Sequence, residues 1–193
     1  MAEAQSIKGS NFRSLLKYVA EMHGADAPDK VIAQLSQADQ RLFDNVIYDG
    51  AWLPERVYAD LSYATDKVFG RGDYSLCFDI GKYNALNCVP KLYSLFIRMG
   101  SPAFVLKSAS NFWRQTHSSG SLVIHEVTPN SAIIHLNDYY GGNYNNPSFC
   151  HGLRGYMSGV LELSGAKDVR MEEVQCGAMG HPTAFLNAYG SDM

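Results

Sequence analysis

The chain has 193 residues and a net charge of −3, with 46% apolar and 18% charged residues. This length and composition allow a hydrophobic core and exclude a disordered protein, and the slight negative charge argues against a general nucleic-acid binder. No apolar run approaches the roughly 20 residues that span a bilayer, so we expect no membrane span. The first residues lack the pattern of a secretion signal. We therefore expect a cytoplasmic protein with one domain over residues 1–193, whose four cysteines are reduced or bind metal.

Residues 10–118 show the apolar spacing of short helices. Asn11 can cap the first helix, and Gly24 can end it. The segment 47–53 is typical of a connection between helices. Capping residues, glycines and prolines mark the other expected helices. One follows Pro28, one is capped by Ser36 with Asp39, and one runs from Pro54 to the break at Gly70. Another runs from Tyr74 to about Asn87 after a cap by Asp73, and two more begin at Pro90 and Pro102.

The pattern changes at Gly120: within the part 120–190, residues 122–127 and 132–137 alternate in character along the chain as strands do. We expect a hairpin from residues 122–127 and 132–137, a loop over 139–147 and a helix over about 148–164. Two more strands, at about 168–176 and 183–189, would close the chain. The fold class is therefore α+β: an N-terminal helical block over 10–118, then a four-stranded antiparallel sheet with one helix between its two hairpins, in the order ββαββ.

Sequence motifs of known catalytic sites are absent. The chain has no Gly-x-Ser-x-Gly elbow, phosphate-binding glycine loop, His-Glu-x-x-His or Cys-x-x-Cys, and its six histidines are scattered. We therefore expect a protein that acts by binding and is not an enzyme.

Two cysteines near the end of the chain form a candidate metal site. Cys150 would open the predicted helix and Cys176 would end the strand after it, so the two ends can meet, with Glu173 nearby. Two thiolates and a carboxylate suit a tetrahedral zinc ion. The alternative, which the spacing alone favours, is two small buried cysteines beside a solvated glutamate.

The same region carries a family resemblance. Gly155-Tyr156-Met157-Ser158-Gly159 after Cys150, and Glu173 with the run from Cys176 to Pro182, resemble the 4-vinyl-reductase-like domain, especially the sensor modules of bacterial activators that respond to phenols. The whole chain, including Phe112 to Arg114, also resembles an uncharacterised family abundant in myxobacteria. The wider fold of these families is shared with haem nitric-oxide sensors and with a transport-particle subunit that holds a fatty acyl chain.

The resemblance implies particular site residues. It implies four metal positions, matching Cys150, Glu173, Cys176 and Ala184; alanine cannot ligate, so His181 or water would have to complete the set. For the ligand it implies His117 and Tyr156, and by position Trp113 and His135 are expected to share the same wall. Such a mostly apolar cavity with few polar groups can orient an aromatic hydroxyl. The alternatives are core packing for Trp113 and Tyr156, and a histidine at a helix C-terminus for His117.

Three functional hypotheses follow. The first is a sensory or adaptor domain that binds a hydrophobic or aromatic small molecule. It would signal through a separate partner protein and as a homodimer, with the apolar stripe of the N-terminal helix as the contact. The second is a haem- or tetrapyrrole-binding protein with His117 or His135 as axial residue. The third is a scaffolding protein without a ligand, whose contact surface would be the loop from Tyr139 to Pro147.

Overall fold

The computed structural model describes residues 5–89, 91–139, 146–181 and 183–193. Within them the helices are α1 (Gly9–His23), α2 (Ala27–Ile32), α3 (Gln37–Gln40), α4 (Glu55–Phe69), α5 (Ser75–Asn87), α6 (Lys91–Met99), α7 (Pro102–Thr116) and α8 (Ser148–Leu163), with short 3-10 helices η1 (Arg41–Phe43) and η2 (Gly177–Met179). The strands are β1 (Ser6–Lys8), β2 (Trp52–Pro54), β3 (Ser121–Val127), β4 (Ser131–Asn137), β5 (Lys167–Gln175) and β6 (Thr183–Ser191). None of the described helices combines the length and apolarity needed to cross a bilayer.

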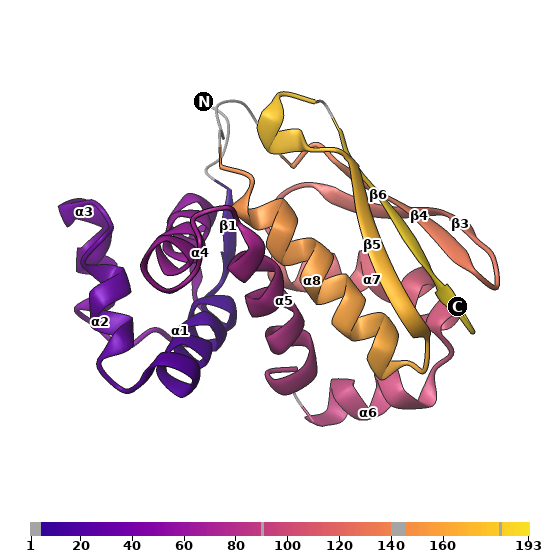
Figure 1. Cartoon of the computed structure of the whole chain (residues 1–193), viewed down its shortest axis with the longest axis horizontal. Coiled ribbons are helices and arrows are strands. Elements are labelled where there is room, and N and C mark those ends of the chain that lie inside the picture. Colours follow the sequence, from indigo (N-terminus) through magenta and orange to yellow (C-terminus); the bar gives the residue numbers. More distant parts are fainter. Residues whose placement is uncertain (1–4, 90, 140–145, 182) are drawn as a thin grey trace.

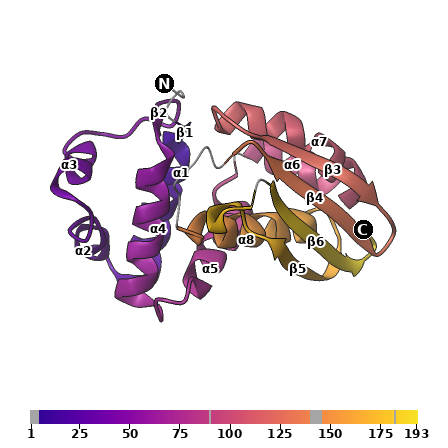
Figure 2. The ribbon, with the colours of Figure 1, turned by 90° about the horizontal axis from the view of Figure 1, so that it is seen from above.

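The four later strands form one antiparallel sheet in the order β3-β4-β6-β5. Along β4, burial alternates so that Ala132, Ile134 and Leu136 face the core. This face of the sheet is covered by α7, which lies against β3, and by α8, which lies against β5. Helices α1 to α4 lie on the far side of α5 and α8 from the sheet (Figures 1 and 2). The predicted mixture of helices with a four-stranded antiparallel sheet is confirmed.

A second, two-stranded sheet was not predicted. β1 and β2 pair antiparallel, with Ile7 opposite Leu53, so the segment 47–53 is not wholly a connection. Each strand has three residues, which is too short for alternation to be visible in the sequence. The strand β1 also bridges Ile7 to His117, which ties the start of the chain to the end of α7.

The first helix begins earlier than expected and its apolar stripe is used internally. Lys8 takes the N-cap position, and Asn11 donates from its side-chain amide to the Lys8 carbonyl, 3.2 Å away. Phe12, Leu15 and Val19 are completely buried in the main core. They are therefore unavailable as the contact of a homodimer, and that part of the dimer hypothesis is wrong.

Glycines bring α5 and α8 into backbone contact. A Cβ on Gly81 would lie 1.9 Å from the carbonyl oxygen of Gly152, and one on Gly155 would lie 1.9 Å from that of Phe78. A Cβ on Gly159 would meet the Ala85 methyl at 2.7 Å. Any side chain at Gly81 or Gly155 would force the two helices apart.

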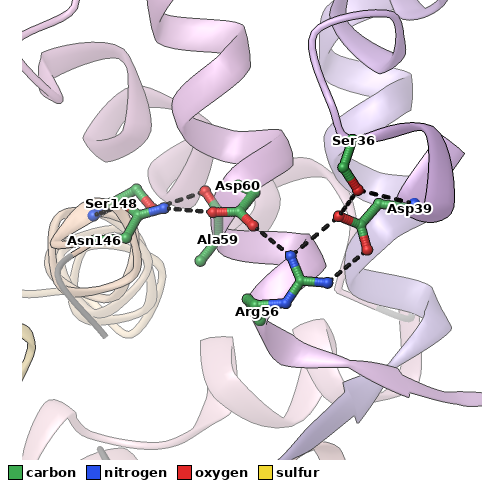
Figure 3. Close-up of polar contacts among 7 residues, drawn as sticks. All are labelled: Ser36, Asp39, Arg56, Ala59, Asp60, Asn146 and Ser148. Atoms are coloured by element: carbon green, nitrogen blue, oxygen red, sulfur yellow. Dashed lines mark hydrogen bonds and ion pairs between the residues drawn. The ribbon is translucent and has the colours of Figure 1, made fainter. Parts of the chain in front are cut away.

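Polar side chains of α4 join the N-terminal helices to the start of α8 (Figure 3). Arg56 makes a two-pronged contact with Asp39, which together with Ser36 caps α3 as predicted. Asp60 accepts from Arg56 on one side and from the side chain of Asn146 on the other. The buried Ser148 hydroxyl donates to the Ala59 carbonyl at 2.8 Å, which fixes the first turn of α8 against α4.

Candidate functional site: a cavity between the two parts of the fold

A cavity of about 960 Å³ lies between the helical part and the sheet-bearing part of the chain. Its lining comes from β1 and α1, from α4 and α5, from α6 and α7, and from the first three turns of α8. The volume falls at the upper end of the range of about 300–1,000 Å³ that is usual for small-molecule and cofactor sites. The cavity is therefore large enough for an organic ligand of considerable size.

Apolar and aromatic side chains form most of one wall. Val105, Leu106 and Trp113 of α7 and Phe149 of α8 are buried and line the cavity. The Trp113 indole donates to the Ser119 carbonyl at 3.0 Å, and this bond fixes the ring against the start of β3. Such a wall favours a flat apolar ligand.

His117 lies at the centre of this aromatic wall. It ends α7, and its ring stacks on Trp113 with centroids 3.7 Å apart and planes within 5° of parallel. The rings of Tyr139 and Phe149 approach it edge-on, each at 5.9 Å. Burial lowers the pKa of His117 to about 3, so the imidazole is neutral near pH 7. Its Nδ1 shares a 2.9 Å hydrogen bond with the Thr116 hydroxyl, which leaves Nε2 as the other ring nitrogen.

Tyrosines and an asparagine supply polar groups elsewhere in the lining. Tyr156 of α8 lines the cavity with 37% of its surface exposed, and burial raises the pKa of its phenol. Burial also raises the pKa of Tyr58 on α4. Asn84 of α5 is buried in the lining, and its Oδ1 has no hydrogen-bond partner among the described residues. The lining thus offers neutral polar groups, which select for a largely uncharged ligand body.

Charged residues of the lining lie at its exposed edge. Lys8, Arg13 and Lys17 come from β1 and α1, and Arg13 pairs with Asp49 at 3.0 Å. Arg13, Lys17 and Asp49 are exposed to solvent, so they mark an opening beside α1. This edge can interact with acidic groups on a ligand whose apolar part lies deeper.

The structure brings three of the four expected ligand-binding residues together. Trp113, His117 and Tyr156 all line the cavity. His135 does not: it points to the opposite face of the sheet, where its ring contacts His125 at 4.1 Å and Phe185 at 4.7 Å. The expectation that His135 shares the wall is wrong, because it alternates with the core-facing residues of β4.

Several lining residues were missed from the sequence. Tyr58 and Asn84 come from helices that we assigned only to packing, and Phe149 comes from the same helix as the expected Tyr156. The available signal was on α5, where Gly81, Asn84 and Cys88 recur at intervals of three and four residues and lie on one face. A polar residue on an otherwise small or apolar helix face is typical of a cavity wall.

The expected cluster of Cys150, Glu173 and Cys176, which we call the cysteine corner, is formed. The possible ligand atoms of Cys150, Glu173 and Cys176 all lie within 4.8 Å of one another, and the Cys176 thiol donates to the Cys150 sulfur at 3.2 Å. The Cys150 thiol can in turn donate to a Cys176 thiolate, and this lowers the pKa of Cys176, although burial and Glu173 oppose the shift. Glu173 and Cys176 converge because β5 has a register shift after Glu173 and ends at Gln175. The buried Ala184 side chain, by contrast, offers no ligand atom.

Comparisons with known proteins identify the fold. No family model matches the sequence, and no curated protein matches it. Solved structures do match: an H-NOX protein from S. oneidensis in the Fe(II)NO ligation state has a TM-score of 0.72 at 11% identity, covering 96% of this chain and 99% of that one. The Fe(II) unliganded H-NOX protein from K. algicida has a TM-score of 0.69 at 15% identity, covering 97% and 98%. An oxygen-binding H-NOX domain related to soluble guanylate cyclases has a TM-score of 0.65 at 12% identity, and the match covers 95% of each chain.

The chain therefore has the H-NOX fold, and the resemblance to the 4-vinyl-reductase-like domain is wrong. The structures that match over nearly the whole chain are H-NOX proteins. The motif that suggested the other family has a packing reason: Gly155 and Gly159 are the positions where α8 touches α5. Glycines at such a helix contact are required by close approach in any fold, so they identify a contact and not a family.

Proposed function

We propose that this chain is a sensory domain that acts by binding a haem, or another flat tetrapyrrole, in the cavity between its two parts. The observation that carries the proposal is His117: a neutral, aromatic-stacked imidazole in the wall of a 960 Å³ cavity. The fold supports it, since one matching structure concerns haem distortion in the H-NOX family and another concerns protein-induced porphyrin distortion.

The residues present fit such a group. Neutral imidazole is the form that binds iron, and a ligating histidine usually has its other ring nitrogen hydrogen-bonded, as Nδ1 of His117 is to Thr116. Trp113 and Phe149 give an apolar wall for a macrocycle, and Lys8 and Arg13 at the opening can pair with its carboxylates. A bound haem would supply iron for a small gas, since the matching H-NOX structures include an oxygen complex and an Fe(II)NO state.

The rest of the chain's own role is to hold and shield that group. Tyr58 and Tyr156 keep their protons, because burial raises the pKa of both, and so they can donate hydrogen bonds into the cavity. The aromatic wall around His117 excludes water from the imidazole. We propose no catalytic step: the domain would report its bound state to a separate partner protein, and as a homodimer by a surface other than α1.

Absorption spectroscopy of the purified full chain tests the proposal. Titration with haemin should give a shifted, intensified Soret band that saturates at about one haem per chain, as expected for one axial histidine. His117→Ala should weaken binding and move the band. His135→Ala is the matched control, because it makes the same change on the outer face of the sheet. It should leave haemin binding and the position of the Soret band unchanged.

Two outcomes would overturn the proposal. If haemin gives no saturable spectral change with folded protein, the cavity does not hold a tetrapyrrole. If His117→Ala and wild type give the same spectrum and affinity, His117 is not the axial residue. Native mass spectrometry of protein purified from its own cells would then show whether an aromatic or other apolar molecule fills the cavity without iron.

For the cysteine corner we propose a packing role in the present sequence. Cys150, Glu173 and Cys176 supply three possible ligand atoms, and the buried Ala184 on the adjacent strand β6 adds none. Three protein donors bind zinc more weakly than the four that closed structural sites use. The buried Cys150 and the half-buried Cys176 instead fill space between α8 and the end of β5.

A further inference from the structure

The outer surface of α6 and the start of α7 carries a group of exposed apolar side chains, which we call the α6–α7 patch. Its members are Leu95, Phe96, Met99 and Phe104, exposed by 56%, 44%, 79% and 46%. Phe96 packs on Phe104 with ring centroids 5.3 Å apart, so the patch is continuous across the turn between the helices. Exposed apolar surface that is contiguous in this way is typical of an interaction site.

The charges around this patch are all of one sign. Between residues 80 and 125 the chain has five lysines or arginines and no aspartate or glutamate, although its net charge is −3. Arg98 lies beside Met99 on α6, and Lys107 and Arg114 follow Phe104 at three- and ten-residue intervals, on the same exposed face of α7. None of the ion pairs in the described part of the chain involves these three residues.

The patch also lies on the outer side of the cavity wall. Tyr93 and Ile97 of α6 line the cavity, while Leu95 and Met99, two residues further along in each case, are exposed. The helix α6 runs along the outer edge of the molecule (Figure 1). One short helix therefore separates the cavity from whatever the patch contacts.

We propose that the α6–α7 patch docks this protein reversibly on an anionic lipid surface. Leu95, Phe96, Met99 and Phe104 would enter the boundary between headgroups and acyl chains, and Arg98, Lys107 and Arg114 would contact lipid phosphates. An apolar helix face flanked by cations is the pattern of helices that lie in a membrane interface. Long basic side chains keep their charge in the headgroup layer while their stems cover apolar surface.

Charge and cavity position favour lipid over a second copy of this chain. A second copy would place the same unpaired cations opposite one another, which disfavours a twofold contact through this patch. A second reason rests on the proposed function. An apolar macrocycle partitions into membranes, and the patch covers the outer side of the cavity wall behind which the macrocycle would be held. The docking itself requires no ligand in the cavity.

Vesicle co-sedimentation with the full chain tests the docking. Wild type should sediment with vesicles of equal parts phosphatidylcholine and phosphatidylserine, and much less with pure phosphatidylcholine. Leu95→Ser with Met99→Ser should lower the partition coefficient about tenfold or more. Met22→Ser with Met179→Ser is the matched control, since these side chains are 59% and 68% exposed outside the patch; it should change partitioning by less than about twofold.

A second pair of variants tests the charges. Arg98→Gln and Lys107→Gln should each weaken binding to the anionic vesicles about fivefold, the equivalent of the roughly 1 kcal/mol that a basic residue contributes near such a surface. No sedimentation of wild type with anionic vesicles overturns the docking, as does equal binding by the patch and control variants. Suppose that wild type does not bind vesicles and that its mass by light scattering is twice that of the Leu95→Ser, Met99→Ser double variant. The patch would then be a contact with a second copy of this chain. Haemin titration is read separately, so either proposal can fail alone.

Discussion

Acid should destabilise this protein through His117, and one substitution isolates the effect. His117 lies in the wall of the cavity, stacked on Trp113, and burial lowers its pKa to about 3. His117→Phe keeps an aromatic ring in that position and removes the titrating group. The two proteins should therefore differ in how their stability depends on pH, whatever the difference in their stability at neutral pH.

The direction and size of this pH effect on the free energy of unfolding follow from proton linkage. The folded pKa is depressed below the ordinary value of 6.5, so the unfolded chain binds a proton at His117 between these values and the folded chain does not. The resulting stability is present above about pH 6.5 and is lost as the pH falls toward 3. Between about pH 7.5 and pH 5, one such histidine lowers the free energy of unfolding by about 2 kcal/mol.

Urea unfolding at these two pH values measures the difference. Wild type should lose about 2 kcal/mol more than His117→Phe between about pH 7.5 and pH 5. His181→Phe, at an exposed histidine, is the control and should follow wild type. If wild type and His117→Phe lose the same free energy, the imidazole is not held neutral, and the argument for a neutral axial histidine fails with it.

Two further changes test contacts inside the fold by urea unfolding. Gly155→Ala should lower the free energy of unfolding by roughly 2 kcal/mol, because the added Cβ would lie 1.9 Å from a backbone carbonyl of α5. Gly152→Ala is its control: the nearest atom to the added Cβ is 3.6 Å away, so the change should be neutral or stabilise by up to about 1 kcal/mol. Asp66→Asn should lose about 1–3 kcal/mol, because the buried carboxylate accepts from two backbone N–H groups of the Tyr74–Leu76 turn, and exposed Asp73→Asn should lose less.

Much of the fold follows from local sequence patterns. Alternation over 122–137 predicted the first hairpin, and Pro102 predicted the start of α7, where the preceding Ser101 accepts from the Phe104 amide. The pairing of β1 with β2 was not predictable, because three residues carry no period and their partner lies more than 40 positions away. Local patterns thus identify elements whose own length contains a repeat, and they miss contacts that only the closed chain creates.

The cavity could be predicted only in part, for a related reason. Trp113, His117 and Tyr156 were identified through a family resemblance that is wrong, yet they line the cavity. Aromatic residues at a helix end beside a hairpin are placed together by the α7–β3 junction, whichever family the chain resembles. His135 was misplaced although the alternation of β4 already separated it from the wholly apolar set Ala132, Ile134 and Leu136, which is the set that faces the core.

The cysteine corner gives the sharpest test of what spacing alone can establish. Cys150, Glu173 and Cys176 meet within 4.8 Å, so three donors already surround a common point. Ala184 is buried on the core-facing side of β6, the side on which α8 packs. If that position completes the set, Ala184→Cys should bind about one zinc ion per chain, since four donors make a closed tetrahedral site.

That binding should also stabilise the fold, because the site exists only in the folded chain. In Ala184→Cys, a chelator should then lower the melting temperature, while in wild type it should change nothing. Ala184→Ser is the control, since it makes a similar steric change and adds no thiolate. A folded Ala184→Cys protein that takes up no zinc would show that the fourth donor cannot reach the other three, and that the shared position of these residues reflects packing between α8 and the sheet.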